Sequence, residues 1–420
     1  MTMTPGRART LFAGILAVVV GACGGMTPTD DRLPVTDPIV PPAYVRPSIV
    51  PIPGHEVYGF LPYWEMDDSI VEHVAATDFT TLGLFSVTHR RDGELDDGQN
   101  GWREINGATG RDLIRVAHDR GQRVELVYTS FGPGKNRQFY TEPDAQARWI
   151  EVLVDLVDEL GFDGVNVDVE ALPVEHVLDF GAFVGRLREA LLARVPDAQV
   201  SVATQANELG AGMAAAAAAA GADRIFLMGY DYHWAGSNPG ASAPMDRLDG
   251  EPRDLVWSLD LYAALGVPVD RTILGLPLYG MTWPVIGPGV GSPSTGRGDA
   301  WVPRRNLAAL ADPLIEPVLE PIQSVEFYAV PMPGVASAPP GSLPSGTVAP
   351  GTATAGPASP EPPGWNAVYF DSPRSLTPKL LLADERGLAG AGFWAIGYER
   401  GLPGYTELIA TFHAGKLRGP

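Results

Sequence analysis

Short apolar runs alternate with longer amphipathic stretches along most of the 420-residue chain, from about His55 onward. The short runs show the period-two alternation or the continuous apolar character of buried strands. They predict eight strands, at Glu56–Pro62, Thr81–Val87, Arg123–Tyr128, Gly164–Glu170, Gln199–Thr204, Arg224–Tyr230, Thr272–Leu278 and Gly390–Ile396. Because helical segments fall between most of them, the pattern favours an α/β fold, a closed (β/α)8 TIM barrel, over an open sheet.

The clearest helix is predicted at Pro143–Leu160, where apolar residues recur at helical spacing. Thr141 and Asp144 are suited to its N-cap, and Gly161 is suited to its end. This helix separates the third predicted strand from the fourth, as a barrel of alternating strands and helices requires.

The first residues have the pattern of an export signal. Arg7 and Arg9 precede an apolar run, Leu11–Val20, which is too short to span a bilayer. The run ends in Val-Gly-Ala-Cys23, which resembles a bacterial lipobox, and Cys23 is the only cysteine of the chain. We therefore expect residues 1–23 to be a lipoprotein signal peptide, with Cys23 lipidated and the protein anchored on the extracytoplasmic face of the membrane. An ordinary signal peptide with a chance cysteine is the alternative.

Two stretches have the composition of unstructured chain. Residues 24–54 read as a flexible tether, and residues 331–364 are nearly all Pro, Gly, Ala, Ser and Thr. The second stretch is expected to be a disordered insertion between strands seven and eight. A domain linker is the alternative, but only one more helix and strand are predicted after it. The barrel is thus expected to cover residues 55–417.

Composition restricts the partners. The chain has 30 Lys and Arg against 50 Asp and Glu, a formal charge of −20, which disfavours nucleic acid and anionic membrane surfaces. Membrane contact is expected through the lipid anchor only. A neutral polysaccharide suffers no such repulsion. With one cysteine and no metal-ligand spacing among seven histidines, no metal or cofactor is expected.

The fourth predicted strand carries the candidate chemistry. In it Asn166, Asp168 and Glu170 share one face, while three valines share the other. In a barrel the polar face would line the interior near the C-terminal end of the strand, where active sites of barrels lie. Two neighbouring carboxyls can divide the work, one ionised and one donating a proton. The alternative is a half-exposed edge strand with a polar face.

This strand resembles the DxxDxDxE signature of glycoside hydrolase family 18, here Asp163, Asn166, Asp168 and Glu170. The resemblance continues along the chain. The matching segments are Met228–Asp231 (MxYD), Gly275–Trp283 (strand seven), Phe393-Trp394 (strand eight) and the wider block Tyr369–Trp394. The sequences of strands four and eight resemble the branch of the family that acts on peptidoglycan or spore-type envelopes more closely than they resemble secreted chitin degraders.

The resemblance implies retaining hydrolysis of β-1,4-linked N-acetylglucosamine-containing glycans, in which the acetamido group of the substrate is the nucleophile. Glu170 would be the proton donor, Asp168 would stabilise the oxazolinium ion, and Tyr230 would hydrogen-bond the acetamido oxygen. The residues that would bind substrate are Asn166, Asp231, Trp394, Tyr279 and Trp64. Asp163, Gly164 and Met228 would serve the structural part of the motifs.

One position departs from the family pattern. The family's second Asp is Asn166 here, and an amide can hydrogen-bond Asp168 but cannot share a proton with it as a carboxylate does. The pH dependence of the family therefore does not carry over. A catalytically inactive carbohydrate-binding protein on the same fold is the alternative function, and the presence of Glu170 argues against it. Chitin, wall glycan and N-linked glycans all contain the required sugar.

We predict that Cys23→Ala abolishes lipidation, because the lone cysteine has no other evident task in the sequence. Wild type should partition with membranes and the variant with the soluble fraction after cell lysis without detergent. Equal partitioning of the two proteins would contradict the anchor.

Overall fold

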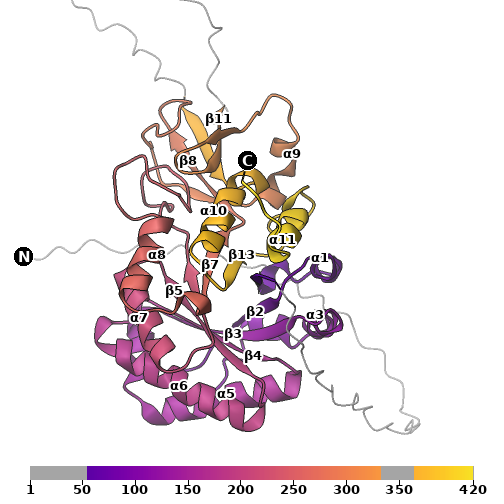
Figure 1. The fold of residues 1–420 in the computed structure, drawn as a ribbon, viewed down its shortest axis with the longest axis vertical. Helices are drawn as coiled ribbons and strands as arrows, with labels where there is room; N and C mark the ends of the chain where they lie inside the picture. The colour runs from indigo at the N-terminus through magenta and orange to yellow at the C-terminus, as the bar shows by residue number, and fades with distance from the viewer. Residues whose placement is uncertain (1–53, 333–363, 420) are drawn as a thin grey trace, which may run out of the picture. The chain divides into compact units, whose positions relative to one another are not determined.

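The computed structural model describes residues 54–332 and 364–419. Within them, eight parallel strands close into a barrel in the order β1-β13-β7-β6-β5-β4-β3-β2. These strands are β1 Glu56–Pro62, β2 Thr81–Val87, β3 Arg123–Phe131, β4 Gly164–Glu170, β5 Gln199–Gln205, β6 Arg224–Met228, β7 Thr272–Pro277 and β13 Gly390–Trp394. The predicted (β/α)8 barrel is therefore confirmed (Figure 1).

Helices connect the barrel strands and cover the outside of the barrel, as α5, α6 and α7 do in Figure 1. The helices are α1 Ile70–Ala76, α2 Asn100–Ile105, α3 Ala108–Asp119, α4 Pro133–Tyr140, α5 Pro143–Leu160, α6 Val177–Arg194, α7 Glu208–Ala219, α8 Leu255–Ala264, α9 Leu307–Leu310, α10 Pro373–Glu385 and α11 Tyr405–His413. None of the helices in the described ranges has the length and apolar character needed to cross a membrane.

The predicted signal peptide with Cys23, the tether as far as residue 53 and residues 333–363 of the predicted insertion lie outside the described residues. Those assignments remain predictions.

The strand ends show where the chain turns toward the barrel mouth. β6 was predicted to reach Tyr230 but ends at Met228. The N–H of the next residue, Gly229, donates to the carbonyl of Gly275 at 3.0 Å. Asp231 then adopts a left-handed backbone with φ of 62°, which Asp tolerates better than most residues. The side chains of Tyr230 and Asp231 are thus presented by a turn and not by a strand.

Helix α5 has the predicted bounds and ends at Gly161, which has the left-handed φ of 83° that suits glycine. The predicted N-cap is wrong. The cap position is Glu142, without a side-chain hydrogen bond. The Thr141 hydroxyl instead donates to the carbonyl of Gln138 at 2.8 Å, so it belongs to the end of α4.

A second sheet of five antiparallel strands was not predicted. Its order is β10-β11-β12-β8-β9, with β8 Gly280–Val285, β9 Asp299–Trp301, β10 Val318–Glu320, β11 Val325–Pro331 and β12 Trp365–Phe370. Figure 1 shows β8 and β11 in this sheet. Two strands and two helices follow residue 364, so the expectation of one strand and one helix there was wrong.

Apolar residues fill both sides of the barrel wall. The valines of β4 pack outward into the main core, and the helix in contact with β4 is α5. Inside, a smaller cluster includes Tyr58, Phe60, Phe85 and Phe226. A Cβ on Gly275 would lie 2.3 Å from the Phe226 ring, so β7 needs glycine there to make room for that ring. This aromatic layer forms the floor beneath the barrel mouth.

We predict that replacing residues 333–363 by a short Gly-Ser turn leaves stability nearly unchanged. β11 and β12 pair as far as Pro331 and Trp365, and the Met332 N–H bonds the Gly364 carbonyl at 3.0 Å. A short turn can therefore join the two strands, and extra loop length costs only about 0.6 kcal/mol per doubling. Thermal unfolding measures the effect, and a fall in Tm of more than a few degrees would contradict it.

Candidate active site

A cavity of about 550 Å³ opens where the barrel strands end. Its wall includes residues from seven of the barrel strands and the turns after them, among them Phe60, Phe85, Thr129, Asp168, Glu170, Tyr230, Asp231 and Trp394. This is the C-terminal face, where side chains from several strands converge in barrels of this type. The cavity therefore gathers residues that are far apart in the sequence.

Strand β4 delivers two carboxyls to this cavity. Asp168 is paired in register with Thr129 of β3 and Ala203 of β5, two small neighbours that leave its carboxyl room at the cavity floor. Asp168 is 5% exposed, and Glu170, at the end of the strand, is half-buried. Both line the cavity.

Asn166 does not reach the cavity. It is fully buried one layer deeper in the barrel, where its Nδ2 donates to the Ser201 hydroxyl at 2.7 Å. Asn166 was expected to bind substrate, but at this depth its side chain does not line the cavity. Asn166 can act on the site only through Asp168, its neighbour on the same face.

Burial raises the pKa values of both cavity carboxyls. Burial is the main cause for Asp168, and the nearby Glu170 raises its pKa further. For Glu170, burial and the charge of Asp231 raise the pKa, while a hydrogen bond from Gln205 Nε2 at 3.2 Å opposes them. A carboxyl with a raised pKa keeps its proton closer to neutral pH, which suits a general acid.

Tyr230 and Asp231 lie beside these carboxyls. Withdrawal from bulk water raises the pKa of the Asp231 carboxyl, which accepts a hydrogen bond from the Tyr279 hydroxyl. The backbone N–H of Asp231 donates to the Ser242 hydroxyl at 3.0 Å. Burial and the nearby carboxyls raise the pKa of Tyr230, so its hydroxyl remains a neutral donor.

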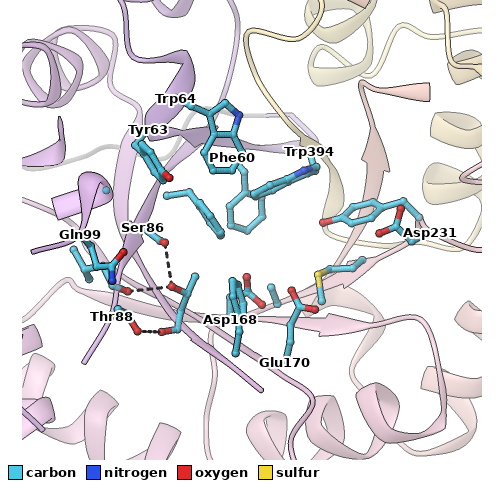
Figure 2. A pocket seen from close by; sticks show the side chains of 18 of the residues that line it. Phe60, Tyr63, Trp64, Ser86, Thr88, Gln99, Asp168, Glu170, Asp231 and Trp394 are labelled. Carbon is cyan, nitrogen blue, oxygen red and sulfur yellow. Dashed lines mark hydrogen bonds between the residues drawn. The ribbon is translucent and has the colours of Figure 1, made fainter. Parts of the chain in front are cut away.

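Aromatic rings form the wall that faces the carboxyls across the cavity (Figure 2). Trp394, at the end of β13, packs edge-on against Phe85, with ring centroids 4.7 Å apart. Trp64 follows β1 in the 3₁₀ helix Tyr63–Glu65 and is 43% exposed. Its Nε1 donates to the Tyr398 hydroxyl at 3.1 Å, which fixes the orientation of the indole. Such rings can stack on the C–H faces of sugars.

A second hollow, of about 560 Å³, continues from the first. The two share Glu170, Met228, Tyr230 and Asp231, and the second adds polar and aromatic residues such as Gln205 and Trp234. Glu170 thus stands between two spaces. That position fits a proton donor at a bond that joins two parts of a longer ligand.

The remaining motif residues lie elsewhere. Asp163 precedes β4 at the opposite end of the strand, where its Oδ2 accepts from the Val124 N–H at 2.8 Å and pairs with His118 Nε2 at 2.7 Å. A Cβ on Gly164 would lie 2.1 Å from the Gln199 carbonyl, so only glycine fits that position. Met228 lines the cavity itself.

Sequence reasoning missed several residues of the cavity. Phe60, Phe85 and Phe131 come from the ends of β1, β2 and β3, and Lys135 comes from α4. The signal that could have identified Phe60 and Phe85 is their position near the C-terminal ends of predicted strands, whereas Phe131 lies beyond the predicted end of the third strand at Tyr128. In the described part of the chain, no three His, Cys, Asp or Glu side chains are grouped so that they could hold a metal ion.

The fold and the site together define a class of protein: a barrel with paired carboxyls and aromatic walls, as in glycoside hydrolases. Residues 124–399 match the sequence profile described as "Glycosyl hydrolases family 18". The chain belongs to this family.

Known relatives agree with this assignment. One is a Bacillus subtilis (strain 168) protein named as a sporulation-specific glycosylase, YdhD, 28% identical over 35% of this chain and 34% of its own length. Another is mouse di-N-acetylchitobiase, 23% identical over 73% of this chain and 83% of its own. The Bacillus cereus spore cortex-lytic enzyme SleL shares the fold, with a TM-score of 0.63, 17% identity and coverage of 85% of this chain and 74% of its own. The match to YdhD thus spans about a third of that protein.

We predict that Asp168→Asn stabilises the protein at pH 7. A carboxyl with a raised pKa binds more protons when folded, so its ionisation destabilises the fold as pH rises from the ordinary carboxyl range through the raised value. The variant should melt about 1 to 2 °C above wild type at pH 7, the effect of roughly 1 kcal/mol on a domain of this size, and close to wild type at pH 4.

Calorimetry at the two pH values measures this difference. Asp197→Asn is the control, because the side chain of Asp197 is exposed and the same change of charge there should have little effect. An Asp168→Asn variant less stable than wild type at pH 7 would mean that the carboxylate is well solvated.

Proposed function

We propose that this protein is a retaining hydrolase of β-1,4-linked N-acetylglucosamine-containing glycans that uses the acetamido group of its substrate as the nucleophile. One observation carries the proposal. Asp168 and Glu170 lie on one face of β4 and open together into an aromatic-walled cavity beside Tyr230. Membership of family 18 supports glycan hydrolysis.

In the first step Glu170 gives its proton to the glycosidic oxygen. The acetamido carbonyl oxygen bonds to the anomeric carbon as the bond to the leaving sugar breaks. The Tyr230 hydroxyl, kept neutral by its raised pKa, donates to that acetamido oxygen and orients it. Because Glu170 borders both hollows, the leaving sugar can depart through one while the intermediate remains in the other.

Asp168 stabilises the positive charge that develops on the acetamido group. The charge of Glu170 raises the pKa of Asp168, so ionisation of both carboxyls together is disfavoured. When one proton resides on Glu170, Asp168 is a carboxylate. That carboxylate stabilises the positive oxazolinium ion in a poorly hydrated site. Glu170, having lost its proton, then removes one from water, whose oxygen adds to the anomeric carbon and restores the acetamido group.

The other cavity residues hold the sugar. Trp394 offers an apolar floor and Trp64 a ring farther along the wall. Asp231, oriented by Tyr279, can accept hydrogen bonds from sugar hydroxyls.

Both chitin-type and peptidoglycan-type glycans remain within the proposal. Di-N-acetylchitobiase is named for a chitin fragment, and YdhD and SleL are named for sporulation and the spore cortex. An exported lipoprotein anchored by Cys23 would meet such polymers at the cell envelope. The alternative of an inactive carbohydrate-binding protein is disfavoured, because Glu170 is retained with access to two hollows.

We predict that Glu170→Gln lowers kcat by about 10²- to 10⁴-fold, the usual contribution of a positioned proton donor. The amide keeps the shape of the side chain, so the melting temperature should not fall. Glu175→Gln is a matched control on the exposed surface. A Glu170→Gln variant with wild-type turnover on chitin oligosaccharides and on peptidoglycan would contradict the assignment.

The stereochemistry tests the nucleophile. Proton NMR of the first product should show retention at the anomeric carbon, and a substrate with hydroxyl in place of the acetamido group should not be cleaved. Mass spectrometry of the ends released from chitin and from peptidoglycan identifies the substrate. Inverted product would require a water-activating carboxylate in place of the acetamido group.

A further inference from the structure

A third carboxyl lies inside the barrel, below the two that reach the cavity. Glu125 of β3 is 1% exposed and takes no part in the proposed mechanism. Its Oε2 accepts hydrogen bonds from the Tyr58 hydroxyl at 2.8 Å and from the Ser201 hydroxyl. A buried carboxyl is costly, so its position inside the barrel calls for a physical reason.

Hydrogen bonds connect Glu125 to the layer beneath the site. Ser201 of β5 is paired in register with Asn166 of β4, and its Oγ accepts from Asn166 Nδ2 at 2.7 Å. Asn166 precedes Asp168 by two residues on the same inward face. A chain of contacts therefore runs from Glu125 through Ser201 to the side chain directly below Asp168.

The direction of these hydrogen bonds is fixed. The Ser201 hydroxyl has one hydrogen, and because Glu125 accepts it, Ser201 must accept from the amide of Asn166. The amide nitrogen is thus held on the Ser201 side, and Oδ1 of Asn166 is turned away from Ser201. Had Glu125 been apolar, Ser201 could donate to the amide oxygen, and only the Tyr58 hydroxyl, which Asn166 also contacts, would hold the amide nitrogen on this side.

Two oxygens next to this chain need a donor. Among the described residues, Asn166 Oδ1 and Asp168 Oδ1 are both buried without a hydrogen-bond partner. These two oxygens are both acceptors, so neither can satisfy the other. A proton on the Asp168 carboxyl would turn it into a donor to the Asn166 oxygen. Burial raises the pKa of Asp168, so the carboxyl holds that proton near neutral pH.

We propose that Glu125 is a positioning residue that, through Ser201, fixes the amide oxygen of Asn166 toward Asp168 and thereby holds the proton of Asp168 between turnovers. This inference rests on the proposed function for its effect on the reaction. It assigns a role to a carboxyl outside the family motif, in a chain where Asn occupies the second carboxylate position of that motif.

The surroundings of Glu125 let it accept hydrogen bonds over a wide pH range. Burial raises its pKa to about 7, the hydroxyls of Ser201 and Tyr58 and the charge of Arg123 oppose that rise, and Asp223 adds to it. From β6, Arg224 also faces it, but Arg224 is paired with Glu56 of β1. A protonated carboxyl keeps an acceptor oxygen, so the orientation of Ser201 survives below the pKa.

The test compares the pH profile of kcat/KM for wild type and Ser201→Ala on one chitin oligosaccharide. Without Ser201 the amide can turn Nδ2 toward Asp168 and favour its ionised form. The acidic limb, which belongs to the Asp168–Glu170 pair, should move down by about one pH unit, as a tenfold change in proton affinity requires. An unchanged limb would overturn the inference.

Three further variants separate this role from a structural one. Thr204→Val removes another buried hydroxyl from β5, one bonded to Tyr262 at 2.9 Å, and should leave the limb in place. Glu125→Leu should reproduce the shift of Ser201→Ala, and Glu125→Gln, which keeps an acceptor oxygen, should restore most of the wild-type limb. Equal shifts in Glu125→Leu and Glu125→Gln would contradict the orientation argument.

A carboxylate at position 166 should make the acidic limb independent of Ser201. In Asn166→Asp the two carboxyls share a proton directly, so adding Ser201→Ala should no longer move the limb. Carbon-13 NMR titration of the Asp168 carboxyl, assigned with Asp168→Asn, reports the same shift without turnover. If wild type cleaves none of the glycans, the proposed function fails while this titration still decides whether Ser201 and Glu125 control Asp168.

Discussion

The burial of carboxyl groups inside a closed barrel is the constraint on which the site depends. A parallel barrel fills its interior with side chains from alternating positions, and here aromatic rings fill most of it. Asn166, Asp168 and Glu170 occupy three successive inward positions of β4, so the polar groups form a single column through an apolar interior. Poor hydration of that column raises the carboxyl pKa values and concentrates electrostatic effects on the substrate.

The elements that follow directly from residue pattern could be predicted. β1, β2, β4 and α5 have the predicted bounds, because strand alternation and helical spacing are local properties. The inward column of β4 follows from parity alone. Phe131 and Gln205 could not be found that way, since they join Glu170 through the register of β3 and a side-chain contact from β5. Two strands of the second sheet, β9 and β10, have three residues each, too few for a pattern.

Asn166 shows where pattern and packing give different answers. As a polar residue of the motif strand it was expected to bind substrate, yet it lies one layer too deep. The inward face of a strand advances about 6.6 Å for every second residue, so only the last positions reach the mouth. The single polar face predicted from the sequence is therefore divided by depth: Asp168 and Glu170 line the cavity, and Asn166 lies beneath them.

The second sheet contributes to the site through the chain that follows β6. This segment carries Asp231, and its later part bonds to the second sheet region. Gln323 Oε1 accepts from the Ala241 N–H at 3.0 Å, and the Gln323 carbonyl accepts from the Met245 N–H at 3.0 Å. Tyr279, just before β8, reaches Asp231 from the same side. Asp231 has a left-handed backbone that costs free energy unless its surroundings hold it, and these contacts supply that restraint. The sheet inserted between β7 and β13 thus stabilises a carboxyl of the cavity wall that the barrel alone would leave on a free turn.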